Sequence, residues 1–300
     1  MIFLKPIDKR TKQQPNIIPY IMNNKTILLL AIALLTWVAP VSGQTPQGAK
    51  NCQFYHLQQT SLAQCIEEGD TSYEKNSLKI MWPIIINDKK CDNLQQELIK
   101  CLTGRDDIHQ FDQAVNYYLY TNAEGEPIDV ESKCSFIDNS SVVDGWKTTT
   151  ASSLIELQSL FERFVTFHMF DYIYFAGAAH GLESNTYLTY DLVLDKVVTF
   201  EDIISDPEAL RPAILQSIKD TYNNSIEFLN LDEDGLPPLA TCFYFDNGAL
   251  HIVYQPYEIT GYAQGTIDVP IYPYMLGDDE DPEAFTPYGL EVLNGTRFGY

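Results

Sequence analysis

His180 has the setting in this chain that is best suited to chemistry. It lies within 175–192, FAGAAHGLESNTYLTYDL, where small residues on both sides would let another molecule approach its ring. An imidazole exchanges protons near neutral pH and could act as a general base. The sequence places no Ser-x-Gly elbow or cysteine nucleophile beside it. We therefore favour a binding or structural role, in which His180 hydrogen-bonds a neighbouring loop.

A second group of interacting residue types follows in PYEITGYAQG, where Tyr257, Glu258 and Tyr262 lie close together. Glu258 and Tyr262 are four residues apart and would share one face of a helix. A carboxylate beside aromatic rings suits a basic side chain or a sugar. In the alternative, structural interpretation, Tyr257 lies in the core and Glu258 closes a short helix. With His180, these three residues are the predicted ligand-binding residues.

The sequence predicts no catalytic residue, metal site or cofactor. The five histidines, at positions 56, 109, 168, 180 and 251, include no His-x-x-x-His pair. The segment Thr199-Phe200-Glu201-Asp202 is similar to a Thr-Phe-Asp-Asp metal motif, but its spacing also fits a helix capping box. We favour the capping interpretation.

Residues 1–43 are predicted to be a secretory signal peptide. Lys25 precedes the apolar run Ile27–Val38, which is too short for a bilayer that needs about 20 residues. Small residues at 41–43 favour cleavage after Gly43. Met22 is an alternative start of translation. We expect a soluble, exported protein in the periplasm or outside the cell, with no membrane span after cleavage.

All six cysteines lie beyond this cleavage site, at positions 52, 65, 91, 101, 134 and 242. Disulfides are the default expectation in an oxidising compartment. Cys91 and Cys101 cannot bond to each other if they share one helix, because about 15 Å of helical rise separates them. Among the remaining pairings we favour Cys52 with Cys65.

The charge of the chain constrains its partners. The formal net charge is −22, and residues 1–43 carry five positive charges and one negative charge, so the exported part has a net charge of −26. Such a surface repels nucleic acid and attracts a strongly basic partner.

The order of elements predicts an α+β fold, with antiparallel sheets, packed helices and two closely associated subdomains. Helical spacing marks 91–102, 111–120 and 206–222, and strand composition marks 78–87, 241–246, 249–255 and 266–276. Residues 162–194 are predicted to form a hairpin, and Asn247-Gly248 a tighter one. We place domains at 50–150 and 151–277, followed by an acidic tail at 278–300 with little to bury.

AGAAHG, KVVTFEDI and NGALHIVYQPYEITGYAQGTIDVPIYPYML occur in an order that resembles a domain of unknown function. This domain is found in the extracytoplasmic half of lysozyme-sensing anti-sigma factors and beside the catalytic module of some peptidoglycan deacetylases. The resemblance covers about 165–276, and 75–160 is similar, more loosely, to the companion domain. It implies an envelope protein that recognises lysozyme, another basic wall hydrolase or a peptidoglycan component. The alternative is a peptidoglycan-modifying enzyme or an accessory domain of one.

Overall fold

The computed structural model describes residues 51–130, 132–141, 143–222, 229–240, 242–276 and 284–297. The predicted signal peptide and the alternative start at Met22 lie outside these residues. Every described residue belongs to one compact unit, which lies within Pro40–Tyr300. Within the described part, no helix is long and apolar enough to cross a membrane.

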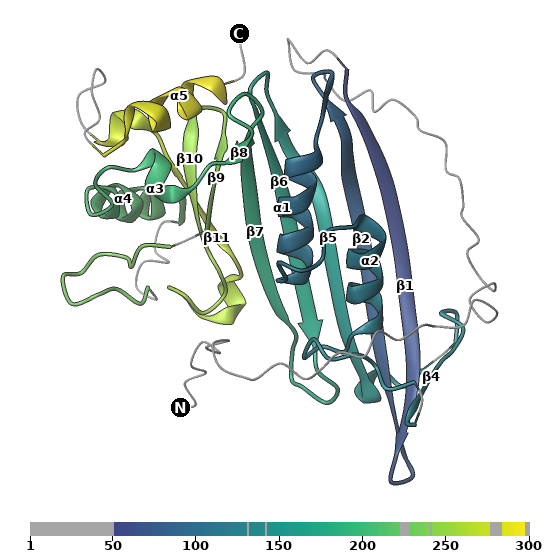
Figure 1. Cartoon of the computed structure of the whole chain (residues 1–300). Coiled ribbons are helices and arrows are strands. Elements are labelled where there is room, and N and C mark those ends of the chain that lie inside the picture. Colours follow the sequence, from purple (N-terminus) through teal and green to yellow (C-terminus); the bar gives the residue numbers. More distant parts are fainter. Residues whose placement is uncertain are drawn as a thin grey trace. The chain divides into compact units, whose positions relative to one another are not determined.

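A large, mostly antiparallel sheet forms the first layer (Figure 1). Its strand order is β4-β1-β2-β5-β6-β7-β8, and β3 pairs with β2. Only the β2–β5 pair is parallel among its described pairs. The strands are β1 (Gln53–Glu67), β2 (Asp70–Ile86), β3 (Lys89–Lys90), β4 (Cys134–Phe136), β5 (Thr148–Leu160), β6 (Phe164–Tyr174), β7 (Leu182–Asp191) and β8 (Lys196–Val197).

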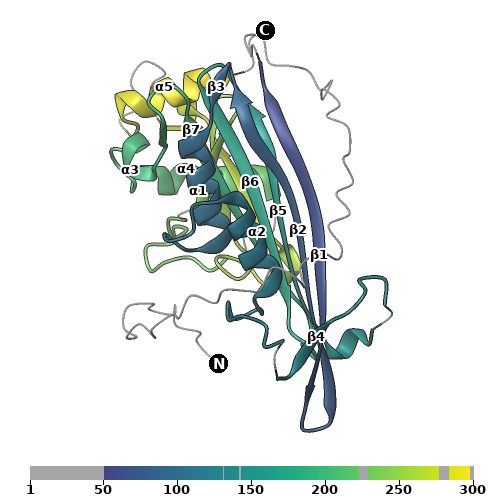
Figure 2. The same ribbon diagram turned by 45° about the vertical axis from the view of Figure 1, so that its right-hand side comes forward.

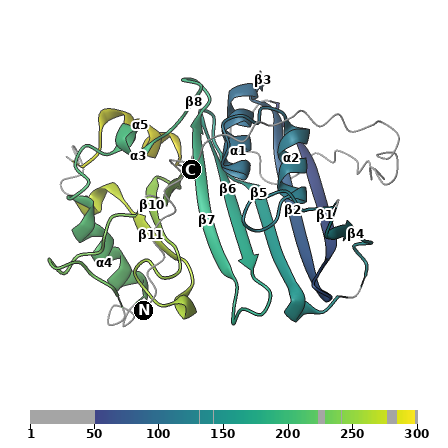
Figure 3. The same cartoon turned by 60° about the horizontal axis from the view of Figure 1, so that its bottom comes forward.

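Two helices, α1 (Asp92–Thr103) and α2 (Phe111–Tyr120), cover one face of this sheet (Figure 3). Both were predicted from their apolar spacing. Leu94, Leu98 and Ile99 of α1 are buried against strand residues such as Ile80 and Phe167, because the apolar stripe of an amphipathic helix packs on the apolar face of a sheet. The first core lies between these two layers.

The elements that follow β8 build a second core. A three-stranded antiparallel sheet has the order β11-β10-β9, and β9 runs beside β7. Three helices pack on it, and Phe245, Tyr254 and Ile214 are among its buried residues. The elements are α3 (Phe200–Ile203), α4 (Leu210–Tyr222), β9 (Cys242–Asp246), β10 (Ala249–Tyr254), β11 (Ile267–Ile271) and α5 (Pro287–Gly295).

Several local predictions are confirmed. β6 and β7 form the expected hairpin. Asn247 and Gly248 turn β9 into β10 with φ values of 47° and 74°, the positive values that a two-residue hairpin turn needs. Thr199 and Asp202 form a capping box at α3, which supports the capping interpretation of that segment. The α+β fold class is also confirmed.

The predicted boundary near residue 150 does not separate two domains. β2 and β5 pair across it within one sheet, and the second core is built mainly by elements that follow β8, with Phe164 of β6. The predicted acidic tail is also wrong for residues 284–297, because Phe285, Val292 and Leu293 are buried in the second core. β2 continues through Pro83 to Ile86, in line with the strand predicted at 78–87.

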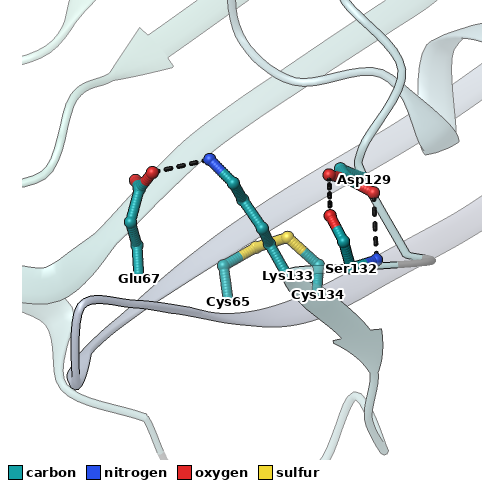
Figure 4. Close-up of a disulfide and its surroundings, with 6 residues drawn as sticks. All are labelled: Cys65, Glu67, Asp129, Ser132, Lys133 and Cys134. Carbon is teal, nitrogen blue, oxygen red and sulfur yellow. Dashed lines mark hydrogen bonds and ion pairs between the residues drawn. A yellow bond between two sulfur atoms is a disulfide. The ribbon is translucent and has the colours of Figure 1, made fainter.

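The structure replaces the favoured disulfide with another one. Cys65 bonds to Cys134, which lies directly opposite it in the β1–β4 ladder (Figure 4). Cys52 precedes β1 and Cys65 lies within it. With about 3.3 Å of rise per strand residue, they are too far apart to bond. The Lys133–Glu67 ion pair lies beside the disulfide, at 2.6 Å between Nζ and Oε1.

Candidate functional site

His180 lies in the connection between β6 and β7, and both of its ring nitrogens have a partner. Nδ1 lies 2.8 Å from the carbonyl oxygen of Gly181, which can only accept, so Nδ1 carries the proton. Nε2 then accepts from the hydroxyl of Tyr257 at 3.2 Å. The side chain is exposed, but hydrogen bonds at both ring nitrogens fix its orientation. This matches the predicted role as a residue that hydrogen-bonds a neighbouring loop.

The neighbouring glycine fixes the place of this turn. A Cβ on Gly181 would lie 2.3 Å from the ring of Tyr172 on β6, so the aromatic ring can pack there only because the side chain is absent. The close approach holds the start of β7 against the end of β6. His180 is thereby presented at the end of the hairpin, next to the connection between β10 and β11.

That connection, residues 255–266, supplies two aromatic rings. The ring of Tyr262 stacks on His180 at 4.1 Å between centroids, and the rings of Tyr257 and Tyr262 stack at 5.7 Å. Tyr257 is 56% exposed, so it is not the core residue of the alternative interpretation. We call His180, Tyr257 and Tyr262 the aromatic cluster.

Glu258 does not join the aromatic cluster. Its Oε2 accepts from the backbone N–H of Gln255 at 2.7 Å and so closes its own turn. The helical spacing assumed for Glu258 and Tyr262 is wrong, because Tyr257 has a φ of 74° and only the short 3₁₀ helix η3 (Tyr262–Gln264) follows. Three of the four predicted residues therefore come together, and Glu258 lies beside them as an exposed carboxylate.

A side-chain amide ties this loop to the large sheet. Gln255 accepts from the N–H of Asn185 and donates to the carbonyl oxygen of the same residue, both at 2.7 Å. This pair of bonds copies the exchange between opposite residues in a β-ladder. The aromatic cluster is thus held on a loop attached to β7 as well as to its own strands.

A row of stacked rings that we did not predict joins the two sheets. His168, Tyr187, Tyr244 and His251 stack in sequence, with centroid distances of 4.7, 4.2 and 4.4 Å. The row crosses from β6 and β7 to β9 and β10. Each of the four strands contributes one ring, and the sequence could not show that the two hairpins lie side by side.

Carboxylates lie at both ends of this row. Asp268 accepts from Tyr244 Oη at 2.6 Å and from His251 Nδ1 at 2.9 Å. Glu156 lies 3.5 Å from His168 Nδ1. Burial raises the pKa of Tyr187 to about 12, and burial together with Asp268 raises that of Tyr244 further, so both phenols stay neutral. The row is a hydrogen-bonded seam between the sheets.

The segment of the sequence that contains the aromatic cluster is strongly acidic. Residues 165–276 contain three basic and sixteen acidic residues, a net charge of −13. Two of the three cations are already paired: Lys196 with Asp202, and Arg211 with carboxylates that include Asp232. In the described part of the chain, no cluster of three or more His, Cys, Asp or Glu side chains has the arrangement of a metal site.

A cleft of about 370 Å³ opens between α1 and β7, away from the predicted residues. Glu97, Lys100 and Cys101 line it on the helix side, and Tyr187 and Leu188 line it on the strand side. None of the four predicted binding residues contributes to it.

A protein family and two solved structures are similar to this chain. The model of a family described as "Protein of unknown function (DUF3298)" matches residues 200–273, inside the segment for which we predicted such a resemblance. None of the curated proteins compared with the chain matches it. The predicted links to anti-sigma factors and deacetylases stay predictions.

Two crystal structures of DUF3298 family proteins are similar to the chain. One from Bacteroides fragilis is 18% identical, has a TM-score of 0.62, and covers 84% of this chain and 99% of its own. One from Pseudomonas aeruginosa is 12% identical, has a TM-score of 0.47, and covers 79% of this chain and 96% of its own. The first comparison shows that the fold is shared with that protein.

Proposed function

We propose that this chain is an exported bacterial cell-envelope protein that binds a basic protein, in the first place a wall hydrolase such as lysozyme. The observation that carries the proposal is the exposed aromatic cluster within a segment of net charge −13. Tyrosine rings offer contact area with little loss of side-chain entropy, and the carboxylates of an acidic segment attract lysine and arginine.

The local geometry supports binding more than catalysis. Both nitrogens of His180 are engaged in hydrogen bonds within the chain, so neither is free to take a proton from a substrate. The hydroxyl of Tyr257 holds the imidazole ring of His180, and the side chain of Tyr257 is still 56% exposed. A pre-oriented exposed ring suits recognition, because less freedom is lost when the partner binds.

Electrostatics support the same class of partner. The exported part carries a net charge of −26, and Lys196 and Arg211 are neutralised within the chain. A basic protein would be steered to this surface at low ionic strength and less so as salt screens the charges. Binding that weakens steeply with salt is therefore expected.

A glycan is the second candidate ligand. The exposed face of Tyr257 could stack on a sugar ring, and the resemblance also implies peptidoglycan recognition. A sugar without charge would bind with little dependence on salt. The salt dependence thus separates the two candidates.

The test is calorimetry of the exported chain with lysozyme, at about 50 mM and about 500 mM salt. We expect binding at low salt that weakens about tenfold or more at high salt. Tyr257→Ala and Tyr262→Ala should each weaken it further, by about tenfold. Tyr274→Ala is the matched control, because Tyr274 is 65% exposed and stacks only on Tyr272 among the described rings.

The same preparation should be mixed with peptidoglycan oligosaccharides, followed by binding and product analysis. No binding to lysozyme at low salt would contradict the proposal. Salt-independent binding of the oligosaccharides would favour the glycan candidate. Cleaved or deacetylated products that disappear in His180→Ala would show an enzyme.

A further inference from the structure

β1 is an edge strand over the first half of its length. It pairs with β2 throughout, but on its other side β4 reaches only Ala63–Cys65 (Figure 2). No other described strand pairs with β1. Edge strands present unpaired backbone groups that can pair with another chain.

Three hydrogen bonds show which residues of β1 point their backbone groups outward. The carbonyl oxygen of Leu62 accepts from Ile137, and the N–H of Ile66 donates to Lys133, both at 2.9 Å. The carbonyl oxygen of Thr60 accepts from the side chain of Asn139 at 2.6 Å. The outward residues therefore have even numbers.

The alternation of a β-strand extends this rule toward the start of β1. Phe54, His56 and Gln58 direct their N–H and C=O groups away from β2, and no described strand takes them up. Tyr55, Leu57 and Gln59 direct theirs toward β2. The open edge thus offers three alternate residues whose backbone groups point outward.

Among the described residues, this edge has little of the usual protection against pairing. Residues 51–66, NCQFYHLQQTSLAQCI, contain no charged residue and no proline, although 20% of the chain is charged. Natural edge strands are commonly blocked by lysine, proline, a bulge or a covering segment. The one irregularity among the described pairs of β1 lies at Gln53/Phe54, at the first of the three open residues.

We propose that the open edge of β1 binds a second copy of this chain, antiparallel and about a two-fold axis at His56. In this arrangement His56 faces the partner's His56, and Phe54 faces the partner's Gln58. The three outward residues of each copy would exchange on the order of six backbone hydrogen bonds.

The side chains fit a two-fold pairing. Tyr55, which is 47% exposed, would lie across from the partner's Leu57, an aromatic and aliphatic cross-strand pair. Because residues 51–66 carry no charged side chain, two-fold pairing of this edge places no like charges opposite each other. An uncharged edge offers a basic partner no ion pairs. It also allows two acidic copies to approach each other with little local repulsion.

The net charge of −26 on each copy opposes association at a distance. Because salt screens this repulsion, dimerisation should strengthen as salt increases. The proposed binding of a basic protein should weaken under the same change. The two proposals therefore make opposite predictions and can fail separately.

The test is sedimentation velocity of the exported chain from about 1 to about 200 µM, at about 50 mM and about 500 mM salt. We expect a monomer at low salt and a dimer at high salt. His56→Glu would place two carboxylates opposite each other and should weaken the dimer at least tenfold. Gln64→Glu is the matched control, because Gln64 is paired with Ser135 of β4 and lies outside the open edge.

Hydrogen exchange supplies a readout within the same strand. The amides of Phe54, His56 and Gln58 should exchange fast in the monomer and slowly in the dimer, whereas those of Tyr55 and Leu57 should be slow in both. A monomer under every condition, or a dimer unaffected by His56→Glu, would overturn the proposal. So would slow exchange of the three outward amides in the monomer, because another segment would then occupy the edge.

Discussion

Glu74 on β2 is a carboxylate whose surroundings oppose its charge. Its Oε2 is buried and has no hydrogen-bond partner among the described residues. Burial, with a smaller contribution from the charge of Glu124, raises the pKa of Glu74 from 4.5 to about 7. Replacing this side chain with a neutral isostere should therefore change how stability depends on pH.

The direction of the effect follows from proton linkage. Between pH 4.5 and pH 7 the folded protein keeps a proton on Glu74 that the unfolded chain has lost. The stability contributed by this group is fully present below about pH 4.5 and is lost as the pH rises through about 7. Each pH unit is worth about 1.4 kcal/mol, which gives about 3 kcal/mol over this window. Since the side chain is only partly buried, we expect about 2 kcal/mol.

Glu74→Gln should leave the free energy of unfolding nearly unchanged at pH 4 and raise it by about 2 kcal/mol at pH 8. Urea unfolding followed by circular dichroism at both pH values measures this difference. Glu126→Gln, in the exposed turn after α2, is the control and should change neither value. If the Glu74 variant shows the same pH dependence as the parent protein, Glu74 is ionised in the folded state and the reasoning is refuted.

Three further predictions concern stability. Asp191 is fully buried, and although burial opposes its charge, hydrogen bonds that include one from Arg163 lower its pKa overall. Its stabilisation is present at neutral pH and is lost as acid protonates it, so Asp191→Asn should cost about 3 kcal/mol at pH 7 and progressively less as the pH falls, measured by urea unfolding. Reduction of the Cys65–Cys134 disulfide, whose ends are 69 residues apart, should cost about 3–4 kcal/mol in the same assay. Gly289→Ala would place a Cβ 2.2 Å from a backbone oxygen and should lower the melting temperature by several degrees, whereas Gly145→Ala, with open space around it, should not.

The elements that could be predicted are those whose cause is local. The apolar spacing of Leu94 and Leu98 marks α1, and Gly104 ends it with a φ of 63°. Asn247-Gly248 specifies its turn through the positive φ that these residues tolerate. The capping box at Thr199 needs only residues three apart. Short-range hydrogen bonds and backbone sterics fix such features wherever the segment lies.

The strand pairing and the cysteine pairing could not be predicted in this way. Residues 148–155 of β5 pair in parallel with residues 73–80 of β2, and the choice between β2 and other apolar strands depends on how the whole core packs. Cys65 meets Cys134 because β4 aligns with β1 at that register. A pairing between distant segments leaves no periodic signal in either segment alone.

The candidate site shows the same division. By itself, the sequence determined the residue types: a histidine among small residues, tyrosines beside a glutamate, and an acidic surface suited to a basic ligand. Only the tertiary structure decided that His180 contacts Tyr257, 77 positions away, and that Glu258 turns back onto its own loop. The reason is physical: side-chain chemistry is a property of each residue, whereas proximity arises from burial of the two cores and from the seam that joins them.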